Sequence, residues 1–196
     1  MREDLIAAVK KVLKDTGSKI PLARLLAIIE VESSGSGFGK DGRLLLQFEP
    51  NVFSRRSGIP LDKLNKWTWD ENKVDVQSKE WLAFEDASKL NPTIAMESTS
   101  WGLPQIMGFN FKLAGYADVK SMVDAFKVSE YNQIVGLMNF INSNRSLYAA
   151  VIAGDYEKVS EIYNGRHHRA PALKNGWKPY PDKLKDTEAK YKNMKL

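Results

Sequence analysis

The sequence contains no cysteine among its 196 residues. This absence excludes a disulfide framework, a thiolate nucleophile and a cysteine-based zinc site. No run of about 18 consecutive apolar residues is present, so we expect no transmembrane helix. The first residues, "MREDLIAAVKKVLKDTG", lack the charged, apolar and small-residue order of a secretory signal, so we expect no signal peptide.

Histidine is almost as scarce, since the chain has only the adjacent His167 and His168. Neighbouring positions of an extended chain point to opposite sides, so this pair does not favour a metal site. No HExxH, Ser-His-Asp or P-loop pattern is found. We therefore expect no metal and no cofactor, and we interpret "GRHHR" as an exposed basic loop.

Positive charge is in excess, with a formal net charge of +5 and a pI near 9.2. This charge suits an anionic partner such as nucleic acid, an acidic polysaccharide or a cell envelope. It is also typical of a protein that only needs to stay in solution. Both interpretations remain open from composition alone.

Helical periodicity dominates the rest of the chain. A short apolar run at residues 43–48, "RLLLQF", follows a turn at 40–42 and is typical of a strand. We expect a mostly α, α+β fold: a single helical domain over residues 1–196 with a small β-hairpin near residues 38–49. Apolar residues at helical spacing predict helices at 2–15, 21–32, 79–90, 119–127, 129–143, 146–153, 155–162 and about 182–194.

Two glutamates, Glu30 and Glu32, stand near the end of the predicted helix 21–32, in "LLAIIEVESSGSGFG". On a helical wheel Glu32 lies roughly 45° from the centre of the apolar stripe, and Glu30 roughly 115° away, on the solvated flank. The negative end of the helix dipole and partial burial should both raise the pKa of Glu32, which suits a general acid. The alternative is a structural carboxylate that caps the helix or pairs with Arg24 or Lys19.

A second carboxylate, Glu49, ends the strand-like run in "LLLQFEPNVF". An acid on a helix followed by an acid on a strand is a workable arrangement for glycoside hydrolysis, in which one group protonates the leaving oxygen and the other holds a water. The alternative is a surface residue that pairs with Arg43, Arg55 or Arg56.

Three short motifs bring in a family resemblance: "VESSG" at 31–35, "ESTSWGLPQIMG" at 97–108 and "EIYNG" at 161–165. In this order they resemble the lysozyme-like fold of goose-type lysozymes and lytic transglycosylases. Together with "LLQFEPNVF", they are similar to the N-acetylmuramidase family of phage endolysins, from about residue 21 to 191. The resemblance implies cleavage of the β-1,4 bond between N-acetylmuramic acid and N-acetylglucosamine in peptidoglycan, without a separate cell-wall-binding module.

The resemblance also implies roles for single residues. Glu32 matches the general acid, and Glu49 is the best second carboxylate. Ser33 would orient Glu32, Gln105 would line the sugar groove, and the Tyr163–Asn164 pair would contact the substrate N-acetyl group or the acid. The implied substrate-binding residues are Ser33, Ser100, Trp101, Gln105, Tyr163 and Asn164.

Some of these assignments have alternatives. Trp101 and Tyr163 could stack on sugars or pack in the core. Glu97 is a distant third carboxylate, better suited to capping or to the surface. Pro104 and Gly108 depart from the transglycosylase pattern and fit the endolysin branch better.

Other functions stay open beside muramidase activity. A lytic transglycosylase would form 1,6-anhydro products without a second carboxylate, and a basic nucleic-acid-binding module or a non-catalytic glycan-binding protein is a more distant alternative. Similarity to goose-type lysozymes favours inversion at the anomeric carbon. The endolysin resemblance implies an enzyme that waits in the host cytoplasm until a holin opens the membrane and then acts on periplasmic peptidoglycan. We also expect a monomer that neither binds nucleic acid nor inserts stably into the membrane.

Overall fold

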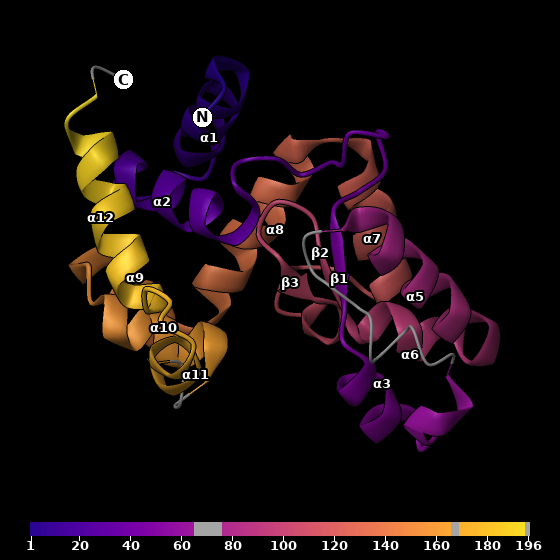
Figure 1. The fold of residues 1–196 in the computed structure, drawn as a ribbon. Helices are drawn as coiled ribbons and strands as arrows, with labels where there is room; N and C mark the ends of the chain where they lie inside the picture. The colour runs from indigo at the N-terminus through magenta and orange to yellow at the C-terminus, as the bar shows by residue number, and fades with distance from the viewer. Residues whose placement is uncertain (65–75, 166–168, 195–196) are drawn as a thin grey trace. The chain divides into compact units, whose positions relative to one another are not determined.

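The computed structural model describes residues 1–64, 76–165 and 169–194 (Figure 1). The chain divides into two compact units. The first unit comprises Met1–Gly35 and Met138–Leu196, and the second comprises Ser36–Leu137. The expectation of one catalytic domain over the whole chain stays a prediction.

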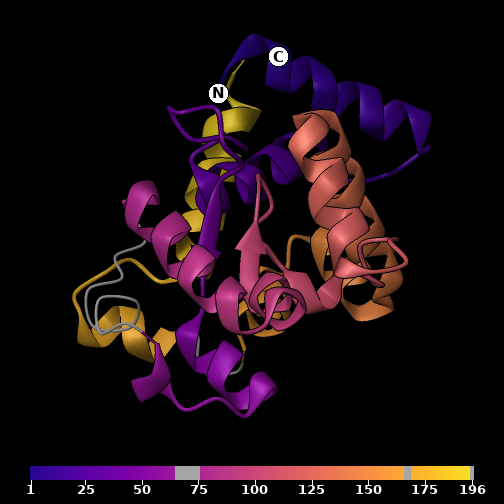
Figure 2. The same ribbon diagram turned by 90° about the vertical axis from the view of Figure 1, so that its right-hand side faces the viewer.

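The first unit is helical. Its central helix is α2, which buries the continuous apolar run from Leu25 to Ile29. Figures 1 and 2 show α12 lying alongside α2. The helices are α1 (Glu3–Asp15), α2 (Leu22–Ser33), α9 (Arg145–Ala153), α10 (Tyr156–Asn164), α11 (Arg169–Lys174) and α12 (Tyr180–Lys192), with the end of α8 (Glu130–Ser143).

Arg24 of α2 bonds residues of two other helices of this unit, α9 and α12. Its guanidinium donates to the carbonyl oxygens of Val151 and Ile152 at the end of α9, at 2.8 and 2.6 Å. It also forms an ion pair with Glu188 of α12, at 2.9 Å. Both charged side chains are largely buried, so each supplies the partner that the other needs. Arg24 is therefore a structural residue that fixes α12 against α2.

The second unit combines helices with a small sheet. Three short strands form an antiparallel sheet in the order β1-β2-β3. Its elements are β1 (Leu46–Phe48), α3 (Pro50–Ser57), η1 (Leu61–Lys63), α5 (Gln77–Leu90), α6 (Pro92–Glu97), β2 (Thr99–Trp101), β3 (Ile106–Met107), η2 (Gly108–Asn110), α7 (Val119–Val128) and the start of α8. The mostly helical α+β fold class is thus confirmed.

The sheet differs in detail from the predicted hairpin. The turn at 40–42 closes a single antiparallel bridge between Phe38 and Leu44, whereas β1 pairs with β2, about fifty residues further along the chain. On its other edge, side chains of α5 take the place of a strand. Gln77 bonds both the N–H and the carbonyl of Leu46, at 3.0 and 2.9 Å, and Glu80 accepts from the N–H of Phe48 at 2.8 Å. The edge of β1 is therefore satisfied without a hairpin partner.

Within the described residues, no helix combines the length and the apolar character needed to cross a membrane.

Candidate functional site

The most unusual carboxylate of the first unit is Glu32, in the last turn of α2. Burial raises its pKa from 4.5 to about 7, although a hydrogen bond from the hydroxyl of Tyr180 to Oε1 opposes the rise. The carboxyl is surrounded by protein, while the residue as a whole keeps some exposed surface. A carboxyl with this pKa carries a proton near neutral pH and can deliver it to a substrate.

Two tyrosines accompany Glu32. Burial and the nearby Glu32 charge raise the pKa of Tyr163 and that of Tyr180 well above the usual range, so both phenols stay protonated. The Tyr163 ring meets Phe140 edge-on, at 5.5 Å between centroids. The structure thus brings Tyr163 to the predicted acid and adds Tyr180, which the sequence analysis missed.

Glu30, only two residues from Glu32, has the opposite chemistry. Burial alone would raise its pKa, but hydrogen bonds from Lys190 and Tyr191 and the Lys190 charge lower it below the usual value. The Lys190 ammonium lies 2.7 and 3.0 Å from the two carboxylate oxygens. Glu30 is therefore an ionised structural residue; it lies off the apolar stripe, as the helical wheel indicated, but is held by α12.

Ser33 and Asn164 belong to the same unit. The Ser33 hydroxyl donates to the carbonyl oxygen of Ile29 at 3.0 Å, within its own helix, so it does not donate to Glu32 here. Asn164 ends α10, but its side chain lies outside the described part of the structure. Their predicted roles in orienting the acid and holding substrate stay predictions. The alternative pairing of Glu32 with Arg24 is not found, because Arg24 bonds α9 and Glu188.

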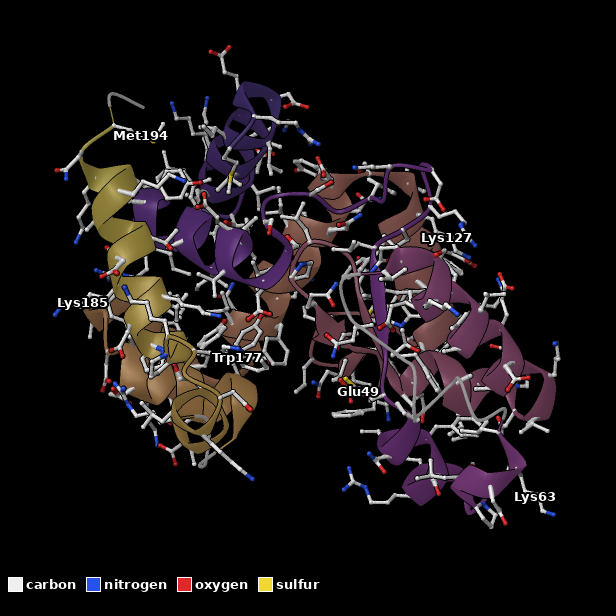
Figure 3. All side chains as sticks on the ribbon, viewed as in Figure 1. Glu49, Lys63, Lys127, Trp177, Lys185 and Met194 are labelled. Atoms are coloured by element: carbon white, nitrogen blue, oxygen red, sulfur yellow. The ribbon has the colours of Figure 1, made fainter. Side chains whose placement is uncertain are left out.

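Glu49 stands at the end of β1 in the second unit (Figure 3). Burial raises its pKa, while a hydrogen bond from the Gln47 amide to Oε1, at 2.9 Å, lowers it. Two of the arginines considered as partners are engaged elsewhere. Arg43 pairs with Asp41 at 2.7 Å, and Arg56 pairs with Glu97. Glu97 is therefore held in an ion pair at the end of α6, whereas the sequence suggested a capping or surface residue.

One face of the small sheet carries polar side chains beside Glu49. Gln47 stands opposite Ser100 in the register of β1 and β2, and Ser100 stands opposite Met107 of β3. The Ser100 hydroxyl lies 3.0 Å from the Met107 sulfur. Because side chains alternate along a strand, Gln47 and Glu49 project on the same side. This face is the better candidate for contact with a ligand.

Trp101 projects on the opposite side of β2 and corrects one prediction. Its side chain is 0% exposed, its indole N–H donates to the carbonyl oxygen of Met96 at 2.9 Å, and its ring packs against Phe84 and Trp81. A ring without exposed surface cannot stack on a sugar. Trp101 is a core residue, which was the alternative considered from the sequence.

Gln105 lies in the turn that joins β2 to β3. Its backbone has a positive φ of 47°, and its amide donates to the carbonyl oxygen of Gly102 at 2.7 Å. The side-chain amide of Gln133 in α8 contacts the same turn. It accepts from the N–H of Leu103 at 2.7 Å and donates to the carbonyl oxygen of Phe126 at 2.9 Å. This buried amide bonds two backbone groups, and it therefore fixes the backbone of the turn that carries Gln105.

Gly102 is required where this turn meets Gln133. It has φ +66°, and a Cβ there would lie 2.7 Å from Gln133 Oε1. We expect Gly102→Ala to lower the free energy of unfolding by about 2 kcal/mol, measured by urea denaturation. Gly42→Ala is the matched control, because Gly42 has φ +76° but no atom within 4 Å of the added carbon. It should cost only about 1 kcal/mol, and an equal loss in both variants would contradict a close contact with Gln133.

One sequence-based expectation falls outside the described residues, namely the exposed basic loop with His167 and His168. Among the described residues, no group of three or more His, Asp or Glu side chains is placed to hold a metal ion. Tyr180 had one signal in the sequence: it lies between two prolines in "KPYP", which fixes the start of a helix.

The chain was then compared with known proteins. The model of the N-acetylmuramidase family matches residues 21–192. The fold is similar to the crystal structure of the Burkholderia AP3 phage endolysin, with a TM-score of 0.74 and 29% sequence identity, covering 95% of this chain and 70% of that one. No curated protein was found to match. The family match includes both units and confirms the resemblance carried by the three motifs. The chain therefore belongs to the N-acetylmuramidase family of peptidoglycan-degrading enzymes.

Proposed function

We propose that this enzyme hydrolyses the β-1,4 bond between N-acetylmuramic acid and N-acetylglucosamine, with Glu32 as the general acid. The observation that carries the proposal is the environment of Glu32: a buried carboxyl with a pKa of about 7, beside two neutral tyrosines. Family membership supplies the substrate class. Such a pKa keeps a large fraction of the carboxyl protonated at neutral pH, as an acid catalyst of glycoside cleavage requires.

In the proposed mechanism, Glu32 gives its proton to the glycosidic oxygen as the bond to the anomeric carbon breaks. Positive charge develops on the sugar ring, and Glu49 takes a proton from the water that attacks it. Burial raises the pKa of Glu49, which makes it a better proton acceptor, and the hydrogen bond from Gln47 limits this rise and favours the ionised form that a base requires. We propose inversion at the anomeric carbon, by similarity to the goose-type architecture.

Analysis of digested peptidoglycan by mass spectrometry tests the reaction type. Hydrolysis leaves muramic acid with a free reducing end, which borohydride reduces, and the product contains the added water. A lytic transglycosylase instead leaves a 1,6-anhydro ring, lighter by one water and resistant to borohydride. We expect reducible products ending in N-acetylmuramic acid. Anhydro products would replace hydrolysis with transglycosylation, and reducible N-acetylglucosamine ends would refute the assigned bond.

Tyr180 supplies a prediction on pH dependence. Its hydrogen bond lowers the pKa of Glu32, so Tyr180→Phe should raise that pKa above about 7. Because the acid must be protonated, activity falls as pH rises through its pKa, and the alkaline limb of kcat/KM should move to higher pH. Tyr191→Phe is the matched control, since Tyr191 bonds Glu30 instead. An unmoved limb in Tyr180→Phe, or an equal movement in both variants, would contradict Glu32 as the acid.

We further propose that the enzyme acts as a phage endolysin. Similarity to the Burkholderia AP3 phage endolysin supports this setting. The enzyme would then be released from the host cytoplasm by a holin and act as a monomer on periplasmic peptidoglycan, without binding nucleic acid or inserting stably into the membrane. The lytic activity is tested directly by the fall in turbidity of a suspension of permeabilised Gram-negative cells after the enzyme is added.

A further inference from the structure

One large aromatic side chain of the first unit stays outside the core. Trp177, in the segment between α11 and α12, is 65% exposed. Tryptophan is on average among the more buried residues, and Trp101 of the same chain is 0% exposed. The indole ring of Trp177 therefore presents a flat apolar face and a polar N–H to solvent, which makes it available to a ligand.

The backbone that carries this ring is held on both sides. The N–H of Trp177 donates to the carbonyl of Ala172 at 2.8 Å, and the N–H of Gly176 donates to that of Leu173 at 3.2 Å. With Gly176 at φ +67°, these bonds form a Schellman motif that ends α11. On the other side, Pro179 precedes α12 with φ −59°. A ring on so restricted a backbone loses little conformational freedom when it binds a ligand.

The position of Trp177 connects it with the candidate acid. It precedes Tyr180 by three residues, and Tyr180 donates a hydrogen bond to Glu32. Three residues of chain span at most about 11 Å, so the Cα atoms of Trp177 and Tyr180 lie within that distance. Figure 3 shows Trp177 near the beginning of α12. The indole is therefore carried by the same short segment as the phenol that donates to Glu32.

We propose that Trp177 is a stacking platform for a sugar ring next to the bond that Glu32 cleaves; this rests on the proposed function. One face of a β-linked N-acetylhexosamine ring presents axial C–H groups, which carry partial positive charge. These groups complement the electron-rich face of an indole, and the indole N–H can donate to the acetamido oxygen of the sugar. Trp177 then binds the glycan strand without taking part in the proton transfers.

Binding without turnover tests this role. In a Glu32→Gln background, titration calorimetry measures the Kd of a tetrasaccharide of alternating N-acetylglucosamine and N-acetylmuramic acid. We expect Trp177→Ala to raise the Kd by about three- to tenfold, because it removes one stacking contact. Trp177→Phe should retain most of the affinity. Leu173→Ala is the matched control: Leu173 is 64% exposed on the neighbouring α11, and its loss should leave the Kd within about twofold.

Several outcomes overturn the platform. They are an unchanged Kd in Trp177→Ala, an equal loss in Trp177→Phe or Leu173→Ala, and no measurable binding by the Glu32→Gln protein. In the active enzyme, Trp177→Ala should raise KM and leave kcat within about twofold. A wild-type protein that releases no reducing ends would instead refute the proposed function. If the wild type is active and Trp177→Ala has the same Kd and KM, the stacking role of Trp177 is refuted while the proposed function stands.

Discussion

Glu32→Gln is expected to lower the rate of peptidoglycan cleavage by about 10²–10⁴-fold, the usual contribution of a positioned general acid. The amide keeps the size of the side chain and can still accept from Tyr180, but it has no acidic proton to give. Release of reducing ends from purified peptidoglycan measures the effect. Glu30→Gln is the control on the same helix, because Glu30 is held by Lys190 and Tyr191. It should stay within about twofold of wild type, and a Glu32→Gln enzyme that retains near wild-type activity would refute the acid assignment.

The same substitution should make the protein more stable above neutral pH. The pKa of Glu32 is about 7 in the folded chain and 4.5 in the reference state, so the folded form keeps the proton between these pH values. Stability of the wild type therefore falls as pH rises from 4.5 through 7, by up to about 3 kcal/mol, because an ionised carboxylate is then buried. Glu32→Gln lacks this loss. Urea unfolding at pH 5 and pH 8 measures how the free energy of unfolding changes with pH in each protein. An equal change in the wild type and in Glu32→Gln would show that Glu32 is not buried as described.

Local periodicity explains why the helices of the first unit could be predicted. The apolar stripe of α2 and the following small residues fix its end near Ser33, and the same stripe separates Glu30 from Glu32. The partners of these two glutamates could not be predicted in the same way. Tyr180 and Tyr191 lie about 150 and 160 residues further along the chain, and only tertiary packing of α12 on α2 brings them to the carboxylates. The spacing of apolar residues therefore predicts which glutamate faces the core, but it does not predict the hydrogen-bond partners of either glutamate.

The second unit shows a different limit of sequence patterns. The apolar run before Glu49 predicts a strand, but a strand does not name its partner, and β1 pairs with β2 rather than with the turn beside it. Strand alternation also explains the correction at Trp101. Ser100 and Trp101 are neighbours in β2, so their side chains point to opposite faces, and only the first faces the side of Glu49. Once the register is known, the burial of Trp101 follows.

Glu49→Gln tests the second carboxylate of the mechanism. If Glu49 activates the attacking water, the variant should lose about 10²-fold in kcat with little change in KM, because an amide cannot take the proton. Glu97→Gln is the matched control in the same unit, since Glu97 is tied to Arg56 by an ion pair. It should stay within about twofold of wild type in the reducing-end assay.

The size of the loss in Glu49→Gln also separates the two chemistries. A transglycosylase uses the muramic 6-hydroxyl as its nucleophile and needs no second acid, so Glu49→Gln would remain active and the products would carry the anhydro ring. Hydrolysis predicts the opposite pair of results. Since Gln47 donates to Glu49, Gln47→Ala should weaken the preference of Glu49 for its ionised form and move the acid limb of the pH profile upward. A limb that stays in place would mean that Glu49 does not act as the base, even if its replacement slows the enzyme.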